Sequence, residues 1–414
     1  MKIIIVNFSD KKGGASRAAK RLHDALLGEQ VDSTMFVLDK NGDEFTIITP
    51  QNYTRKITAK IQTILNPLPL RNKKIESPFS VSFSPSFNIV NAINKQKADI
   101  VHLHWVNAGM LRIEDLAKIN APIVWSLHDM WPFTGGCHYA DSCELYKENC
   151  GTCPVLNSAK ENDLSRSIFK RKNKTYSKIT NLTIVGLSNW LQGCAKSSTL
   201  FKNRTIVNLP NPINTKIYKP IDKEKARAFF GLTNEKKYIL FGAMFATSDV
   251  RKGFKKLKDA FDFLENKQIE LLVFGSEKPE KEQNFGFKTH YLGKINEDSK
   301  LKKLYNAANV MVVPSLQENL SNVIMESLSC ATPVVAFNIG GNKDLINHKK
   351  NGYLAEPLNS KDLALGIDWV LNSKDTDFLS KSARLKVLEN FDNSVVAKKY
   401  KSLYGEIINK SILK

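Results

Sequence analysis

Two glutamates stand eight positions apart in the segment "PSLQENLSNVIMESL", residues 314–328: Glu318 and Glu326. Apolar positions spaced three and four apart predict a helix there, with an inner face formed by Leu320, Val323, Ile324 and Leu328. A helix N-terminus carries unpaired N–H groups and partial positive charge, so it binds phosphate or sugar oxygens well. One glutamate lies just before this terminus and the other lies two turns into the helix. This spacing suits the binding of an elongated polyol with a charged centre. The alternative is that Glu318 only complements the helix dipole and that Glu326 is a solvated surface residue.

Two adjacent cations, Arg251 and Lys252, precede the helix predicted in "GFKKLKDAF". Positive side chains at such a place can neutralise the charge that develops on a diphosphate leaving group. No Asp-x-Asp pair follows a predicted strand near them, so we expect no divalent metal or other cofactor in catalysis.

The first half of the sequence offers two further candidate segments. Gly13 and Gly14 separate the first predicted strand from a helix, where glycine lets a ligand approach the backbone, although a plain turn is the commoner explanation. His102, His104 and His128 lie at or near predicted strand ends. We interpret the first two as hydrogen-bonded structural residues and His128 as the candidate site residue.

Four cysteines crowd into "GGCHYADSCELYKENCGTCP": Cys137, Cys143, Cys150 and Cys153. Four thiolates that end in a Cys-x2-Cys pair can form a tetrahedral structural zinc site, and a reducing cytoplasm keeps them available. The first spacing is irregular for such a site, so free or disulfide-paired cysteines are the alternative. Cys194 and Cys330 stand alone, and we expect them to be packing residues.

Short β-branched runs and helix-like segments alternate along most of the chain, which is typical of parallel sheets covered by helices. A proline-rich stretch without periodicity, "VNLPNPINTKIYKP", interrupts the alternation. We therefore predict two similar α/β halves with a cleft between them: residues 1–208 with a Cys-rich insertion at 130–160, a linker at 209–222, and residues 223–391. Residues 392–414 are predicted to be a final helix.

The composition of the 414 residues, 42% hydrophobic and 25% charged, is ordinary for a soluble globular protein. The formal net charge of +20 fits an anionic partner, such as nucleic acid, anionic lipid or a phosphorylated substrate. No interleaved aromatic motif supports nucleic acid, so we expect none bound. Residues 54–74 mix apolar positions with Lys and Arg and contain no acidic residue. This predicts a basic amphipathic patch that rests on anionic lipid, with a solvated segment of no function as the alternative.

The N-terminus "MKIIIVNFSD" has the pattern of a strand rather than of a cleavable signal, and no apolar run of about eighteen residues occurs. We expect a cytoplasmic protein that at most touches the inner face of the membrane.

The segment "VVPSLQENLSNVIMESLSCATPVVAFNIGGNKDLINHKKNGYLAEP" resembles the donor-binding segment of glycosyltransferase family 4, and the resemblance runs over nearly the whole chain. It implies a retaining enzyme with the GT-B fold, in which two Rossmann-like domains face a cleft and a C-terminal helix crosses back. The N-terminal domain would bind a glycan or lipid-linked acceptor and the C-terminal domain a UDP- or GDP-sugar. The expected function is sugar transfer in bacterial surface-polysaccharide assembly, and a nucleotide-sugar epimerase of similar architecture is the alternative.

The resemblance also implies roles for individual residues. Glu318 would contact the donor sugar, Glu326 would hold the ribose hydroxyls, and His128 would lie beside the donor sugar. Further donor-binding residues are expected at the glycine loop and the helix mouth: Gly13, Gly14, Asn319, Leu320, Ser321 and Asn322.

Lys252 in "RKGF" matches the family's Lys-Gly, so we expect it to act in catalysis beside Glu318 and His128. The family's usual arginine, a few residues earlier, is absent, since Ala246 and Thr247 occupy that region. The sequence leaves open whether Arg251 replaces it in binding the donor.

Overall fold

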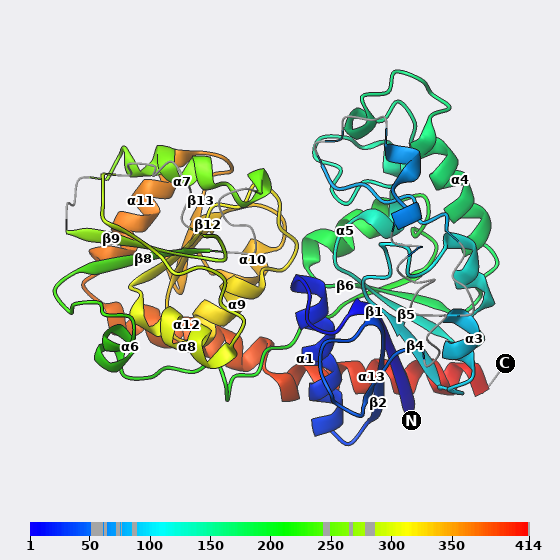
Figure 1. Ribbon diagram of the computed structural model, residues 1–414, viewed down its shortest axis with the longest axis horizontal. Helices are drawn as coiled ribbons and strands as arrows, with labels where there is room; N and C mark the ends of the chain where they lie inside the picture. Colours follow the sequence, from blue (N-terminus) through cyan, green and yellow to red (C-terminus); the bar gives the residue numbers. More distant parts are fainter. Residues whose placement is uncertain are drawn as a thin grey trace. The chain divides into compact units, whose positions relative to one another are not determined.

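The computed structural model describes residues 1–50, 61, 64–71, 75, 77–84, 89–242, 249–264, 268–277 and 286–412. The chain forms two compact units, one of residues 1–211 with 396–414 and one of residues 212–395. Each unit is a parallel sheet with helices on both faces (Figure 1), so the predicted α/β architecture of two halves is confirmed.

The first unit has a seven-stranded sheet among its described residues, in the order β3-β2-β1-β4-β5-β6-β7 with every neighbouring pair parallel. The continuous apolar run Ile3–Val6 is buried on both faces of this sheet, which explains why it does not alternate with polar residues. The strands are β1 (Lys2–Ser9), β2 (Asp32–Asp39), β3 (Ile47–Ile48), β4 (Ile100–Leu103), β5 (Ile123–Leu127), β6 (Leu182–Gly186) and β7 (Thr205–Asn208).

Helices cover both faces of this sheet. Those described are α1 (Gly14–Gly28), α3 (Ile89–Asn94), α4 (Leu164–Tyr176), α5 (Asn189–Ser197) and α13 (Asn393–Ile412). Short 3-10 turns carry much of the remaining chain: η1 (Leu68–Leu70), η2 (Ile113–Lys118), η3 (Trp131–Phe133), η4 (Leu145–Lys147) and η5 (Pro154–Leu156). The last three lie in the Cys-rich insertion.

The second unit has a six-stranded parallel sheet among its described residues, in the order β10-β9-β8-β11-β12-β13. Its strands are β8 (Lys237–Gly242), β9 (Ile269–Phe274), β10 (Thr289–Tyr291), β11 (Val310–Val313), β12 (Val334–Phe337) and β13 (Gly352–Ala355). Since β8 lies directly beside β11, the strand order reverses between these two strands. Ligands of open α/β sheets bind outside the carboxyl ends of strands at such a point.

Helices α7 and α11 cover one face of this sheet, while α6, α8, α9 and α12 lie on the other (Figure 1). Their bounds are α6 (Lys223–Phe229), η6 (Val250–Lys252), α7 (Phe254–Phe261), α8 (Asp298–Ala307), α9 (Asn322–Ser329), α10 (Asn342–Leu345), α11 (Ser360–Leu371) and α12 (Thr376–Asn390). Helix α9 begins at Asn322, so Glu318 lies in the loop after β11, four residues before the helix.

Helix α13 packs its C-terminal part onto the first unit, as the family resemblance implies. Tyr400 and Tyr404 are fully buried, and their hydroxyl groups hydrogen-bond Ser126 of β5 and His102 of β4. Among the described residues, no helix is long and apolar enough to cross a membrane.

Candidate active site

The loops that follow β8 and β11 bring Lys252 and Glu318 together at the point where the strand order of the second unit reverses. The Nζ atom of Lys252 lies 3.1 Å from Oε2 of Glu318, and both side chains retain partial exposure, 25% and 15%. The predicted cation and the first glutamate of the predicted pair therefore form one ion pair at the carboxyl edge of the sheet.

Gly253 makes this pairing possible. Its φ of 69° is left-handed, and a Cβ at this position would lie 1.8 Å from the carbonyl oxygen of Pro314, just after β11. Beside it, the N–H of Leu316 donates to the carbonyl oxygen of Arg251 over 2.7 Å. The two loops thus touch through their backbones. This contact explains why glycine follows Lys252, since a side chain at position 253 would clash with Pro314.

The guanidinium of Arg251 is paired with the carboxylate of Asp249. Its Nε and Nη2 atoms lie 3.2 and 2.7 Å from the two carboxylate oxygens of Asp249. A bound phosphate would have to compete with this carboxylate for the guanidinium. Ala246 and Thr247 lie outside the described residues.

Glu326 is buried, with 1% of its surface exposed, on helix α9. The hydroxyl of Tyr305, on α8, donates to its Oε2 over 2.7 Å. Burial excludes the alternative that Glu326 is a solvated surface residue. A buried carboxylate is costly unless its oxygens are hydrogen-bonded, so Tyr305 is a partner that sequence reasoning missed.

The four residues of the predicted helix mouth lie partly outside the helix. Asn319 and Leu320 are buried in the loop, Ser321 occupies the N-cap position without capping through its side chain, and Asn322 is the first helical residue. The backbone N–H of Gly341, after β12, donates to the carbonyl oxygen of Glu318 over 3.4 Å. The paired glycines that follow β12 therefore lie against the Glu318 loop.

In the first unit, His128 follows β5 and is joined to a histidine interpreted from sequence as structural. Its Nε2 lies 2.8 Å from Nδ1 of His104, whose ring lies against that of His102 with 4.4 Å between centroids. Burial lowers the pKa of His102 to about 3 and that of His128 to about 4, and it holds the pKa of His104 well below its usual value. His128 is therefore a neutral imidazole at pH 7, able to donate or accept a hydrogen bond without carrying charge.

His102 is fixed by a chain of hydrogen bonds whose direction can be worked out. The Tyr400 hydroxyl donates to the carbonyl oxygen of Leu209, so it accepts from the Ser126 hydroxyl 3.3 Å away. Ser126 in turn accepts from Nε2–H of His102 over 2.8 Å, which leaves Nδ1 to accept from the Tyr404 hydroxyl over 2.7 Å. Tyr400 and Tyr404 of helix α13 thereby fix the position of His102, which lies against His104.

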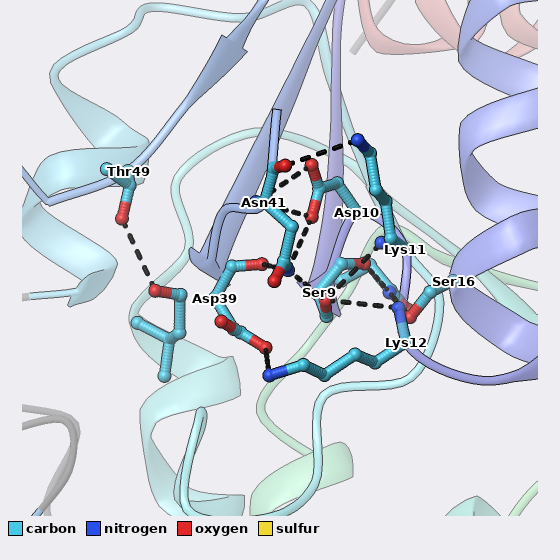
Figure 2. A network of polar contacts seen from close by, with 10 residues as sticks. Ser9, Asp10, Lys11, Lys12, Ser16, Asp39, Asn41 and Thr49 are labelled. Carbon is cyan, nitrogen blue, oxygen red and sulfur yellow. Dashed lines mark hydrogen bonds and ion pairs between the residues drawn. The ribbon is translucent and has the colours of Figure 1, made fainter. Parts of the chain in front are cut away.

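Gly13 is the N-cap of α1, with a φ of 91°, and Gly14 is the first residue of that helix. The preceding loop is held by a polar network (Figure 2) in which the buried Asp10 carboxylate accepts from the backbone and side-chain nitrogens of Asn41. Lys12 pairs with Asp39 at 2.7 Å in the same network. These contacts fix the course of the glycine loop after β1.

Asp129, next to His128, has its own partner. Its carboxylate lies 2.6 Å from Nδ1 of His138, whose Nε2 is 2.8 Å from the Ser80 hydroxyl, and it accepts from the N–H of Trp131. Burial raises the pKa of Asp129, and the His138 contact with these hydrogen bonds outweighs it, so that the pKa is lowered. This pair anchors the start of the Cys-rich insertion to the end of β5.

The four cysteines of the insertion line a single cavity in the first unit, and all are free thiols. As they stand, no three His, Cys, Asp or Glu side chains in the described part of the chain are grouped closely enough to hold a metal ion. Burial raises the pKa of Cys137 and Cys150 to about 12. Cys330 is buried, and Cys194 is half-buried against the core of the first unit.

Comparison with protein families matches both halves of the chain. The family described as glycosyl transferases group 1 matches residues 222–386, and the one described as Glycosyltransferase Family 4 matches residues 12–178. The chain belongs to glycosyltransferase family 4. The family resemblance of this glycosyltransferase therefore extends over both units. The matches favour a transferase over the epimerase alternative.

Several curated relatives are similar to this glycosyltransferase. An uncharacterized glycosyltransferase of Methanocaldococcus jannaschii is 26% identical over 77% of this chain and 86% of its own. The colanic acid biosynthesis glycosyl transferase WcaC of Escherichia coli is 28% identical over 38% of this chain and 40% of its own. An E. coli galactosyltransferase named for the acceptor α-D-GlcNAc-diphosphoundecaprenol is 29% identical over 26% of this chain and 28% of its own.

Solved structures share the fold of the whole chain. Sucrose-phosphate synthase of Thermosynechococcus elongatus has a TM-score of 0.69 at 18% identity and covers 99% of this chain and 100% of its own. HepE of Anabaena, solved with UDP-glucose, has a TM-score of 0.64 at 17% identity and covers 98% of this chain and 100% of its own. The glycosyltransferase therefore has the GT-B fold predicted from its sequence.

Proposed function

We propose that this glycosyltransferase takes its sugar from a nucleotide-diphosphate donor bound by the second unit and retains the anomeric configuration. The observation that carries the proposal is the ion pair of Lys252 and Glu318 at the carboxyl edge of that sheet. The ammonium group is available to a diphosphate, and the carboxylate can accept hydrogen bonds from sugar hydroxyls once donor binding loosens the pair. Glu326, buried on the adjoining helix, is the proposed partner of the ribose hydroxyls.

The proposed chemistry needs positive charge at the leaving group. As the bond from the anomeric carbon to the phosphate oxygen breaks, the negative charge on the diphosphate grows and Lys252 stabilises it. The acceptor hydroxyl attacks the same face of the sugar, and its proton passes to the departing phosphate oxygen. Neutral His128 of the first unit is proposed to hydrogen-bond a sugar hydroxyl. No step draws on a divalent metal.

A UDP-sugar is the first donor to test, because HepE, which shares the fold, is described in complex with UDP-glucose. The proposed acceptor is a glycan or lipid-linked saccharide of bacterial surface-polysaccharide assembly. A relative named for a diphosphoundecaprenol-linked acceptor and one named for colanic acid biosynthesis support this class.

A panel of UDP- and GDP-sugars tests the proposal by thermal shift and donor hydrolysis. We expect one donor to raise the melting temperature and to be slowly hydrolysed, and Glu326→Ala to lose the shift while remaining folded. NMR of the transferred sugar should show the donor's anomeric configuration. A product of inverted configuration, or a panel without any binding or hydrolysis, would contradict the proposal.

We also propose that the protein works at the inner face of the membrane. The support is the net charge of +20 and the basic segment 54–74, most of which lies outside the described residues. Sedimentation with liposomes decides: binding to anionic but not to neutral vesicles is expected, and equal binding to both would remove the hypothesis.

A further inference from the structure

The four cysteines of the insertion surround one cavity of about 20 Å³. They reach it from separate turns between η3 and η5. Gly135 and Gly151 also line it, and a Cβ at these positions would clash with Ser165 and with the carbonyl oxygen of Glu161. A cavity needs about 10–15 Å³ to hold one water molecule, so this one has room for a single atom or small ion.

Backbone hydrogen bonds hold the Cys-x2-Cys pair, and one of them ends on a sulfur atom. The N–H of Gly135 donates to Sγ of Cys150 over 3.1 Å. The N–H of Leu156 donates to the carbonyl oxygen of Cys153 over 3.1 Å. Burial disfavours the thiolate of Cys150, and the donor aimed at its sulfur opposes that effect by stabilising the thiolate, which is the form of cysteine that binds metals.

A buried cation lies beside the same cluster. Lys172 of α4 is fully buried, and its Nζ donates to the carbonyl oxygens of Trp131 and Thr134 and lies 3.8 Å from the centroid of the Trp131 ring. Burial lowers the pKa of Lys172 to about 7, and thiolates at Cys137 and Cys150 act in the opposite direction by stabilising its ammonium form.

A buried ammonium group is costly without nearby negative charge. Asp129 supplies part of this negative charge, but its carboxylate is already hydrogen-bonded to His138. The negative charge of Asp163 disfavours a thiolate at Cys153. The Asp163 carboxylate is itself hydrogen-bonded by the N–H groups of Cys153 and Arg166. Four thiolates around a divalent cation would carry two net negative charges, which Lys172 would balance in part.

We propose that Cys137, Cys143, Cys150 and Cys153 bind one structural zinc ion. The thiols must draw together for this, since no three of them are grouped for coordination as they stand. We expect Cys143 to be the thiol that moves, because it is partly exposed and its neighbours Asp141, Ser142 and Glu144 are exposed. Binding releases the four thiol protons to solvent, and four sulfur ligands leave no position for substrate, so the ion ties the turns of the insertion together.

Metal analysis of the full chain, purified in reductant without chelator, tests the site. We expect about one zinc per chain, four thiols that react only after chelation or unfolding, and a melting temperature that falls on chelation. Cys150→Ser and Cys153→Ser should lose the zinc. Cys194→Ser, which changes a thiol outside the cavity, should keep it.

Three results would overturn the proposal, and each can be read on the unmodified protein, so the outcome does not depend on whether a variant folds. They are background zinc with all four thiols titratable in the native state, a disulfide among the four, and stoichiometric iron in place of zinc.

Discussion

The hydroxyl of Tyr305 lies 2.7 Å from Oε2 of Glu326, and both side chains are buried. The Tyr305 ring packs against Phe274 and Tyr218, so α8 holds this hydroxyl in place. Tyr305 therefore orients the carboxylate that we propose to bind the donor ribose.

We expect Tyr305→Phe to weaken nucleotide-sugar binding by about tenfold or more, because a hydrogen bond to a charged group is worth about 1.5–3 kcal/mol. Tyr353→Phe is the matched control, since Tyr353 donates to the Asp362 carboxylate at 2.8 Å in the same unit. Isothermal titration with the donor measures both. If the two variants bind the donor with equal affinity, Tyr305 does not contribute to donor binding.

Gly253→Ala should both destabilise the second unit and impair donor binding. Its φ of 69° disfavours alanine, and the new Cβ would clash with the Pro314 carbonyl oxygen. Gly231→Ala is the control, because its φ of 66° brings the same backbone strain with no atom within 4 Å of the Cβ. We expect the control to cost about 1–2 kcal/mol in urea unfolding and to bind donor normally. A Gly253 variant that behaves like the control would show that the loop contact is dispensable.

The strand periods were enough to predict the two sheets. The Glu-x7-Glu spacing and the family's Lys-Gly pattern pointed to Glu318 and Lys252, which the structure joins in one ion pair. Tyr305 and His104 were missed as partners of Glu326 and His128, because each contact joins residues more than 20 positions apart that share no motif. The start of α9 was placed too early, since apolar spacing continues through Leu320 although the loop does not yet turn into a helix.

Stability should fall as the pH drops below about 6.5, because the first unit buries neutral histidines. Burial lowers the pKa of His102 to about 3 and that of His23 to about 4, from a usual 6.5. Between these values the unfolded chain binds more protons than the folded one. The stabilisation is thus complete above pH 6.5 and lost as the pH falls, by about 1.4 kcal/mol per pH unit for each histidine.

Urea unfolding at pH 7.5, 6.5 and 5.5 measures this slope. His102→Gln should make it shallower, even if the variant is less stable at every pH. His348→Gln, at an exposed histidine, should leave the slope as it is. A stability that does not change over this range would contradict the assignment of neutral buried histidines.

The last prediction concerns the cation at the proposed leaving group. Lys252→Met should lower turnover about a hundredfold or more, because one charge-stabilising donor in a transition state is typically worth that much. The donor should still bind, since Glu326 and the helix mouth remain. Lys255→Met removes an exposed lysine three residues along the same segment and should leave turnover unchanged. Initial rates at saturating donor distinguish the two variants, and a Lys252 variant with normal turnover would rule out leaving-group stabilisation by this residue.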